Sequence, residues 1–265
     1  MSGVGRYATL LGVQLRASFA QAAQYRVDFV LGAVLSAFWT AAAVTPLLVI
    51  YDRRPTLGGW TRDEALVVVG FFTLLKGAIQ GVIEPSVTNT VEHLRKGTLD
   101  FLLLKPADAE FLVSTTRLQP WRATDAVGGL VLLAWALHAV GRAPGIGAVA
   151  ATAALVVAAL AILHSLWVLV VSLAFVTVKV DNLTFLLGSV YDAARWPASV
   201  WRGALAWVFT LVVPLTVMTT WPALAVLGRL DAVRGVGALA LAAAFVAASR
   251  AVWTRSIRNY TSAGG

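Results

Sequence analysis

The feature that most constrains this chain is a set of long apolar stretches without any formal charge. Residues 146–178 contain no Asp, Glu, Lys or Arg, and the same is true of residues 29–51. A run of about 20 apolar residues crosses a bilayer core of about 30 Å as a helix, because a helix satisfies its own backbone hydrogen bonds. Only 13% of the 265 residues are charged, against about 25% in an average soluble domain. The chain is therefore predicted to be an all-α integral membrane protein.

The apolar runs predict six crossings within a single transmembrane domain, residues 1–265. Before the first crossing, residues 5–25 place apolar side chains on one helical face and Arg16 opposite, which is typical of an interfacial helix. This segment lacks the long apolar core and cleavage site of a signal peptide, so we do not expect it to be removed. The predicted crossings are residues 29–51, 65–84, 124–141, 146–178, 182–196 and 234–254.

Residues 182–230 allow two topologies, because charges and prolines interrupt their apolar character. In one, residues 182–202 lie on the inner surface and residues 203–227 cross once. In the other, residues 182–196 cross and residues 197–230 dip in and out as broken helices from the outer side. Both leave the termini on one side, where most of the 21 lysines and arginines fall. The positive-inside rule then places both termini on the cytoplasmic side of the plasma (cell inner) membrane.

Motifs for common catalytic chemistry are missing from the sequence. There is no Gly-x-x-x-x-Gly-Lys-Ser/Thr loop for ATP and no His-Glu-x-x-His zinc motif. The chain has no cysteine, and its three histidines, His93, His138 and His164, are scattered over a loop and two crossings. We therefore expect no enzyme activity, metal site or cofactor in this chain. Its basic residues lie at the ends of apolar segments, which favours contact with membrane lipids and not with nucleic acid.

Lys76 is the most costly residue, because a cation near the middle of a crossing costs a few kcal/mol unless it is paired or faces water. One interpretation is structural, with Lys76 snorkelling or pairing with a neighbouring helix. The other is functional, with Lys76 facing a hydrated pathway together with Gln80 and Glu84. Glu84 is the nearest acidic residue on the same helix, two turns away.

The segment at residues 91–110 carries mixed charge and too few apolar residues to cross a membrane. Gly97 and Pro106 bracket a short amphipathic piece, which we expect at the membrane surface with one face available. On physical grounds alone it is either a solvated loop with a surface helix or a docking element for a soluble partner.

Two stretches resemble a known family. The stretch at residues 94–106 reads LRKGTLDFLLLKP and resembles the Ile-x-x-Gly-x-Leu-Asp-x-x-Leu-Leu-x-Pro segment of ABC-2 type permeases. Residues 194–228 read ARWPASVWRGALAWVFTLVVPLTVMTTWPALAVLG and are similar to the Tyr-Pro … Ile-Pro … Pro-Ala-x-x-Leu-Gly segment of the same family. Trp196 stands where tyrosine is commoner. The two matches lie in the family's order, and the resemblance covers essentially the whole chain.

The resemblance implies the permease subunit of an ATP-driven exporter, with an architecture like that of type V exporters. Such permeases pair with the same chain or a paralogue and bind two copies of a separate ATPase, which holds the ATP and Mg. The resemblance also favours the second topology, with re-entrant breaks around Pro197, Pro214 and Pro222. It further favours the interpretation of Lys76 as a residue that lines the pathway. The cytoplasmic coupling helix of the family maps onto Glu92, Arg95, Lys96, Gly97, Leu99, Asp100, Leu102, Leu103, Leu104, Lys105 and Pro106.

Two other functions remain as alternatives. A secondary, ion-coupled transporter would need buried carboxylates along the crossings, whereas Asp28, Glu84, Asp125 and Asp192 all lie near the ends of predicted segments. A non-transporting membrane scaffold or a membrane enzyme is the other alternative, and an enzyme would need a polar cluster at one depth, which the sequence does not indicate.

Overall fold

The computed structural model of this chain describes residues 3–24, 26–115, 117–119, 122–175 and 181–260. Over these ranges the chain is helical and forms no sheet, with one isolated bridge between Leu57 and Trp60. Residue 25 of the predicted interfacial helix and residues 176–178 of the predicted fourth crossing lie outside the described residues. The elements are α1 (Gly3–Gln24), α2 (Arg26–Arg53), α3 (Arg62–Ala78), η1 (Ile79–Ile83), α4 (Glu84–Arg95), α5 (Asp100–Leu103), α6 (Ala109–Thr115), α7 (Ala123–Val140), α8 (Ile146–Ala174), α9 (Asp181–Tyr191), η3 (Asp192–Arg195), η4 (Ala198–Val200), α10 (Ala204–Trp207), η5 (Val208–Val212), η6 (Thr216–Thr220), α11 (Trp221–Val226) and α12 (Ala232–Arg258).

Four of the described helices are long and apolar enough to cross a membrane: Val30–Arg53, Arg62–Arg95, Ile146–Ala174 and Ala232–Arg258. A fifth candidate is the pair Ala204–Val212 and Thr216–Val226, whose two parts are bent by 70° to one another. The apolar helix Thr124–Val140 is shorter, and α9 has 11 residues. The membrane-spanning, all-helical character is therefore confirmed, while the count of six crossings stays a prediction.

The helix that begins at α3 does not end near residue 84 but continues through η1 and α4 to Arg95. Pro85 sits in the first turn of α4 and has no N–H, so it cannot bond the carbonyl of Gly81 one turn earlier. That carbonyl accepts a hydrogen bond from the backbone N–H of Gln119 instead, at 2.8 Å. The π-helical turn of η1 is thus stabilised by the segment that precedes α7. One continuous helix, Arg62–Arg95, joins the bundle to the segment of mixed charge at residues 91–110.

Glycines hold α3 and α7 in very close contact. A β-carbon on Gly77 would lie 2.5 Å from the backbone nitrogen of Ala126, and one on Gly129 would lie 2.4 Å from that of Leu74. Both separations are far below van der Waals contact, so only glycine allows this approach. On the other side of α3, α8 packs against α11 and α12.

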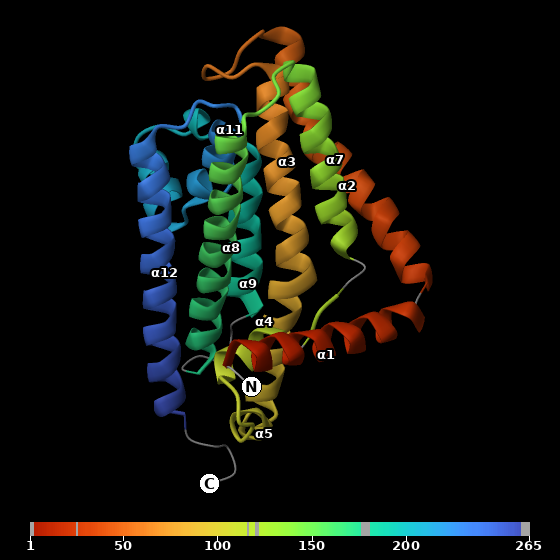
Figure 1. The fold of residues 1–265 in the computed structure, drawn as a ribbon, viewed down its shortest axis with the longest axis vertical. Helices are drawn as coiled ribbons and strands as arrows, with labels where there is room; N and C mark the ends of the chain where they lie inside the picture. Colours follow the sequence, from red (N-terminus) through yellow and green to blue (C-terminus); the bar gives the residue numbers. More distant parts are fainter. Residues whose placement is uncertain (1–2, 25, 116, 120–121, 176–180, 261–265) are drawn as a thin grey trace.

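Figure 1 shows α1 lying across the lower ends of the other helices, roughly at right angles to the bundle. The start of α1, the end of α12 and α5 lie at this same end, whereas the loop between α2 and α3 lies at the opposite end. We call the end that holds α1 and α5 the lower end, and the opposite end the upper end.

Candidate functional site

Lys76 on α3 belongs to a cluster of opposite charges. Its Nζ lies 3.0 Å from Oδ1 of Asp192, and Nη2 of Arg195 lies 3.4 Å from the same oxygen. The Lys76 Nζ and the Arg195 guanidinium also sit above the ring of Phe72, at 5.3 and 5.5 Å from its centroid. One carboxylate therefore neutralises part of two cations among apolar helices, which lowers the cost of placing them there.

The carboxylate of Asp192 is held in place by the residues on both sides of it. Tyr191 is buried, stacks on Phe72 at 5.2 Å between ring centroids, and donates a hydrogen bond from its hydroxyl to the carbonyl of Phe72 at 3.0 Å. The hydroxyl of Thr219 donates to the carbonyl of Ala194 at 2.8 Å. The short helix η3 is thus fixed between α3 and η6, with Asp192 aimed at Lys76.

Lys76 and Asp192 line a cavity of about 760 Å³ between α2, α3 and the start of α7. Gln80 also lines it and accepts a hydrogen bond from Nη1 of Arg122 at 3.0 Å. Of the predicted pathway residues, Glu84 is not among those that line the cavity, and its side chain is exposed. The charged residues that the pathway prediction did not include are Arg122, Asp125, Asp192 and Arg195.

The second candidate site is the helical turn α5 at the lower end. The helix α4 ends in a Schellman motif, with Gly97 at φ 65°, its N–H bonded to the carbonyl of Leu94 and the N–H of Thr98 bonded to that of His93. This left-handed position favours glycine and turns the chain sharply into α5. The bracket that the sequence predicted at Gly97 therefore has a specific conformational cause.

The turn α5 divides its apolar side chains between two faces. Leu99 and Leu102 are buried, whereas Phe101 and Leu104 are 70% and 81% exposed. Among the predicted docking residues, Leu103 and Asp100 are partly buried, and Arg95, Lys105 and Pro106 are exposed. Glu92 and Lys96 are also exposed and form an ion pair at 2.6 Å. Phe101 was absent from the predicted set, because sequence alone does not say which residues of an apolar turn face inward.

Contacts from α1 hold the segment that follows α5. The guanidinium of Arg6 donates to the carbonyl of Pro106, and the hydroxyl of Tyr7 accepts a hydrogen bond from the N–H of Asp108 at 3.1 Å. The rings of Tyr7 and Phe111 meet edge to face at 4.8 Å. These contacts fix α1 against the loop between α5 and α6.

Arg250, near the lower end of α12, pairs with two carboxylates of the same segment. Its guanidinium makes a two-point contact with Asp108 and bonds Oε2 of Glu110 at 2.6 Å. The hydrogen bond from Arg250 holds the pKa of Asp108 below its ordinary value of 3.8. We call Arg250, Asp108 and Glu110 the lower-end ion cluster.

The three prolines predicted as re-entrant breaks occupy different settings. Pro214 lies between η5 and η6, at the 70° bend of the broken pair. Pro197 precedes η4, in an extended conformation at φ −55° and ψ 142°. Pro222 lies in the first turn of α11, inside the continuous helical stretch Thr216–Val226.

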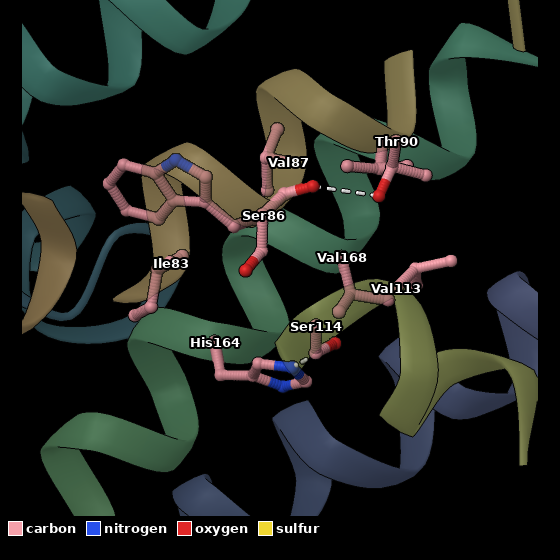
Figure 2. A pocket seen from close by; sticks show the side chains of 10 residues that line it. Ile83, Ser86, Val87, Thr90, Val113, Ser114, His164 and Val168 are labelled. Carbon is pink, nitrogen blue, oxygen red and sulfur yellow. Dashed lines mark hydrogen bonds between the residues drawn. The ribbon is translucent and has the colours of Figure 1, made fainter. Parts of the chain in front are cut away.

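No group of three or more potential metal ligands occurs within the part of the chain that the structure describes. Figure 2 shows His164 on α8 pointing toward Ser114 on α6, with its Nε2 at 2.9 Å from the serine hydroxyl. The pocket beside them holds about 20 Å³, which is the space of about one water molecule. It is a packing gap, not a site for a substrate.

The comparisons with known proteins agree with this arrangement. Searches of curated sequences and of solved structures found no match. A family model described as "ABC-2 family transporter protein" matches residues 37–264, which include the charged residues that line the cavity, the α5 turn and the broken helix pair. Because this match covers most of the chain, we conclude that the protein belongs to the ABC-2 transporter family and is a membrane transport permease.

Proposed function

We propose that this chain is the permease subunit of an ATP-driven exporter, and that a separate ATPase docks on α5. The observation that carries the proposal is the pair Phe101 and Leu104, two large apolar side chains exposed on a single turn. Exposed side chains of this kind lose water when a partner covers them, and aromatic anchors dominate many interfaces. The turn is backed by the buried Leu99 and Leu102, so a force applied to it is not absorbed locally.

The same turn is connected mechanically to the charged cavity. The continuous helix Arg62–Arg95 leads directly from α5 to Lys76, and a helix of 34 residues is about 50 Å long at 1.5 Å per residue. Movement of α5 therefore displaces the α3 wall of the cavity relative to its α2 wall. In the proposed cycle, closure of the ATPase pair moves α5 and shifts the permease between inward-facing and outward-facing states.

The proposal also covers the partner subunits, the number of crossings and the orientation of the chain in the membrane. A second permease, either this chain or a paralogue, completes the pathway, and two ATPase copies supply the ATP and Mg. The shorter helices α7 and α9 are counted as the third and fifth of six crossings, in a type V-like arrangement. The lower end, with both termini, lies on the cytoplasmic side of the plasma membrane.

Co-purification with a co-expressed candidate ATPase subunit tests the docking surface. We expect Phe101→Glu and Leu104→Glu to abolish association and the vanadate-sensitive ATP hydrolysis of the complex. Ile146→Glu is the matched control, because Ile146 is 91% exposed and starts α8 at the upper end. Equal ATPase recovery with all three variants would rule out α5 as the docking element.

Labelling tests the orientation independently. The chain contains no cysteine, so Leu104→Cys introduces a unique thiol at the lower end. A membrane-impermeant maleimide should label it in inside-out vesicles and not in intact cells. Labelling in intact cells would show that the lower end faces outward, and docking of a cytoplasmic ATPase on α5 would then be ruled out.

An ion-coupled transporter is the second candidate, because Asp125 and Asp192 both line the cavity. Under this alternative a proton or cation gradient drives transport and ATP does not. Export from vesicles that hold ATP but have a collapsed proton gradient separates the two. Continued export supports the ATPase-driven permease, whereas export that requires the gradient supports the carrier.

A further inference from the structure

The cavity around Lys76 carries an excess of positive charge. The described charged side chains that line it are three basic residues, Lys76, Arg122 and Arg195, and two acidic ones, Asp125 and Asp192. Asp192 is already shared by Lys76 and Arg195. An anion entering the cavity therefore finds cations whose charge is only partly balanced, within a wall of low polarity that strengthens the attraction.

Arg122 is presented to the cavity in a fixed orientation. Its Nη1 donates to Oε1 of Gln80 at 3.0 Å, and its Nε donates to Oε1 of Gln119 at 2.9 Å. Both acceptors are uncharged amides, so they orient the guanidinium without cancelling its charge. A guanidinium held this way suits the oxygens of a carboxylate, sulfate or phosphate group.

The opposite wall of the cavity is apolar and belongs to α2. Leu31, Leu35 and Trp39 line it. A second hollow of about 680 Å³ adjoins the cavity between α2 and α7 and shares Ser36, Thr40 and Thr124 with it. The other residues that line this second hollow are Ala33, Ala37, Ala41, Val44, Val127 and Gly128.

The two spaces together suit a molecule with one charged end and one apolar end. Each volume lies within the range of about 300–1,000 Å³ that is usual for ligand sites. Val34 and Phe38 on α2 are exposed in the single chain, and the proposal takes this face of α2 as the side from which a membrane-dissolved molecule reaches the hollow. An ion without an apolar tail would fill only the charged part.

We propose that the cavity binds an anionic amphiphile, with its carboxylate, sulfate or phosphate group against Arg122, Lys76 and Arg195 and its alkyl chain between α2 and α7. The proposal rests on the proposed function in taking this molecule as the exported substrate, although its binding is measurable without an ATPase. Neutral relatives of the same chain length lack the attraction to these cations, and cationic relatives are repelled by them, so both are expected to bind more weakly.

Native mass spectrometry of the purified chain in a neutral detergent tests this binding, with no ATPase or nucleotide present. The probes are tetradecanoate, dioleoyl phosphatidylglycerol, tetradecanol, tetradecylammonium and hexanoate. We expect one copy of tetradecanoate or phosphatidylglycerol per chain, and binding about tenfold or more weaker for the last three probes. Binding of only phosphatidylglycerol identifies a bilayer lipid as the source, and binding of tetradecanoate identifies a single-chain amphiphile.

Variants locate the ligand. Arg122→Gln and Arg195→Gln should each weaken binding of the anionic probes about tenfold. Arg142→Gln, which removes the same charge from the exposed turn between α7 and α8, should leave binding unchanged. Gly128→Leu should weaken tetradecanoate more than hexanoate, because a β-carbon there already lies 3.8 Å from Oγ of Ser36 and a longer side chain fills the hollow.

The expected pattern applies to variants that stay monodisperse and helical, as measured by size exclusion and circular dichroism. Should Arg195→Gln fail to fold, Arg122→Gln and Gly128→Leu still decide the matter. Equal binding of tetradecanol and tetradecanoate, or undiminished binding in both Arg122→Gln and Gly128→Leu, overturns the proposal. Either result leaves the docking of an ATPase on α5 untouched, because that is measured separately.

Discussion

The molecule contains two clusters in which cations share carboxylates, and their settings differ. Lys76, Arg195 and Asp192 meet inside the bundle, among residues of α3 and η3 that are partly buried. The lower-end ion cluster joins α12 to the segment after α5, at the margin of the bundle. The side chains of the two clusters are similarly exposed, 27–42% in the first and 13–49% in the second. What differs is their position, because Lys76 lies on a helix long and apolar enough to cross a membrane, whereas the second cluster lies at the lower end.

This difference indicates different roles. A charged group at membrane depth lowers stability and is retained where function needs it, so we propose that the cluster of Lys76, Arg195 and Asp192 belongs to the pathway. The lower-end ion cluster costs little and links three separate parts of the chain, α6, α12 and, through Asp108 and Tyr7, α1. We interpret it as an anchor that keeps α5 in a fixed position.

The largest expected effect is the loss of stability when Asp192 is removed. Asp192→Ala leaves Lys76 and Arg195 without their shared carboxylate, and we expect a loss of roughly 2–3 kcal/mol in stability. The expected loss is no larger because the side chains of Lys76 and Asp192 are 30% and 42% exposed, and solvent screens their attraction. Thermal unfolding in detergent measures the loss.

The double variant Lys76→Met with Asp192→Asn is its control. Removing both charges should restore most of the stability while transport stays impaired. If Asp192→Ala alone is as stable as the unchanged chain, the cluster lies in water and the contrast with the lower end disappears.

A second effect concerns the wall that carries Lys76. Gly77→Ala forces a β-carbon into the backbone of Ala126, and we expect a loss of about 1–3 kcal/mol together with a shift of α3 away from α7. Gly237→Ala is the matched control, since a β-carbon there meets nothing within 4 Å. A Gly77→Ala chain that unfolds at the same temperature as the control would contradict the close contact.

At the lower end the expected effect is smaller. Arg250→Gln removes the ion pairs to Asp108 and Glu110, and we expect at most about 1 kcal/mol of lost stability. The anchor role predicts a clear loss of ATPase association nevertheless, because α5 is no longer held. Arg255→Gln, on the same helix and exposed, should retain association. Equal association in both variants would show that α5 keeps its position without the cluster.

The general architecture could be predicted from the sequence because its causes are local. Runs of apolar residues predict helices that cross a membrane, and Gly97 and Pro106 bracket the predicted short amphipathic piece in which α5 lies. Lys76 stood out because it is a lone cation in an apolar run.

The remaining features depend on contacts between distant residues. Asp192 is 116 positions from Lys76, and no sequence pattern links the two. The exposure of Phe101 depends on how α5 packs on α6, and the continuation of α3 past residue 84 depends on the hydrogen bond from Gln119 to Gly81. Close contact of α3 and α7 was likewise hidden, because Gly70, Gly77 and Gly129 do not differ in sequence from the other glycines.

The smallest effect is the response of the lower-end ion cluster to acid. The pKa of Asp108 is lowered in the folded chain by its hydrogen bond from Arg250, so the pair adds stability at pH values above the ordinary value of 3.8. As the pH falls below that value and through the lowered pKa, Asp108 becomes protonated and the added stability is lost. An environment-sensitive fluorophore on Leu104→Cys should report a change in the surroundings of α5 in this acid range, and the change should be absent when Arg250→Gln is added. The same titration curve with and without Arg250 would mean that the anchor depends on Glu110 and Tyr7 and not on the charge of Asp108.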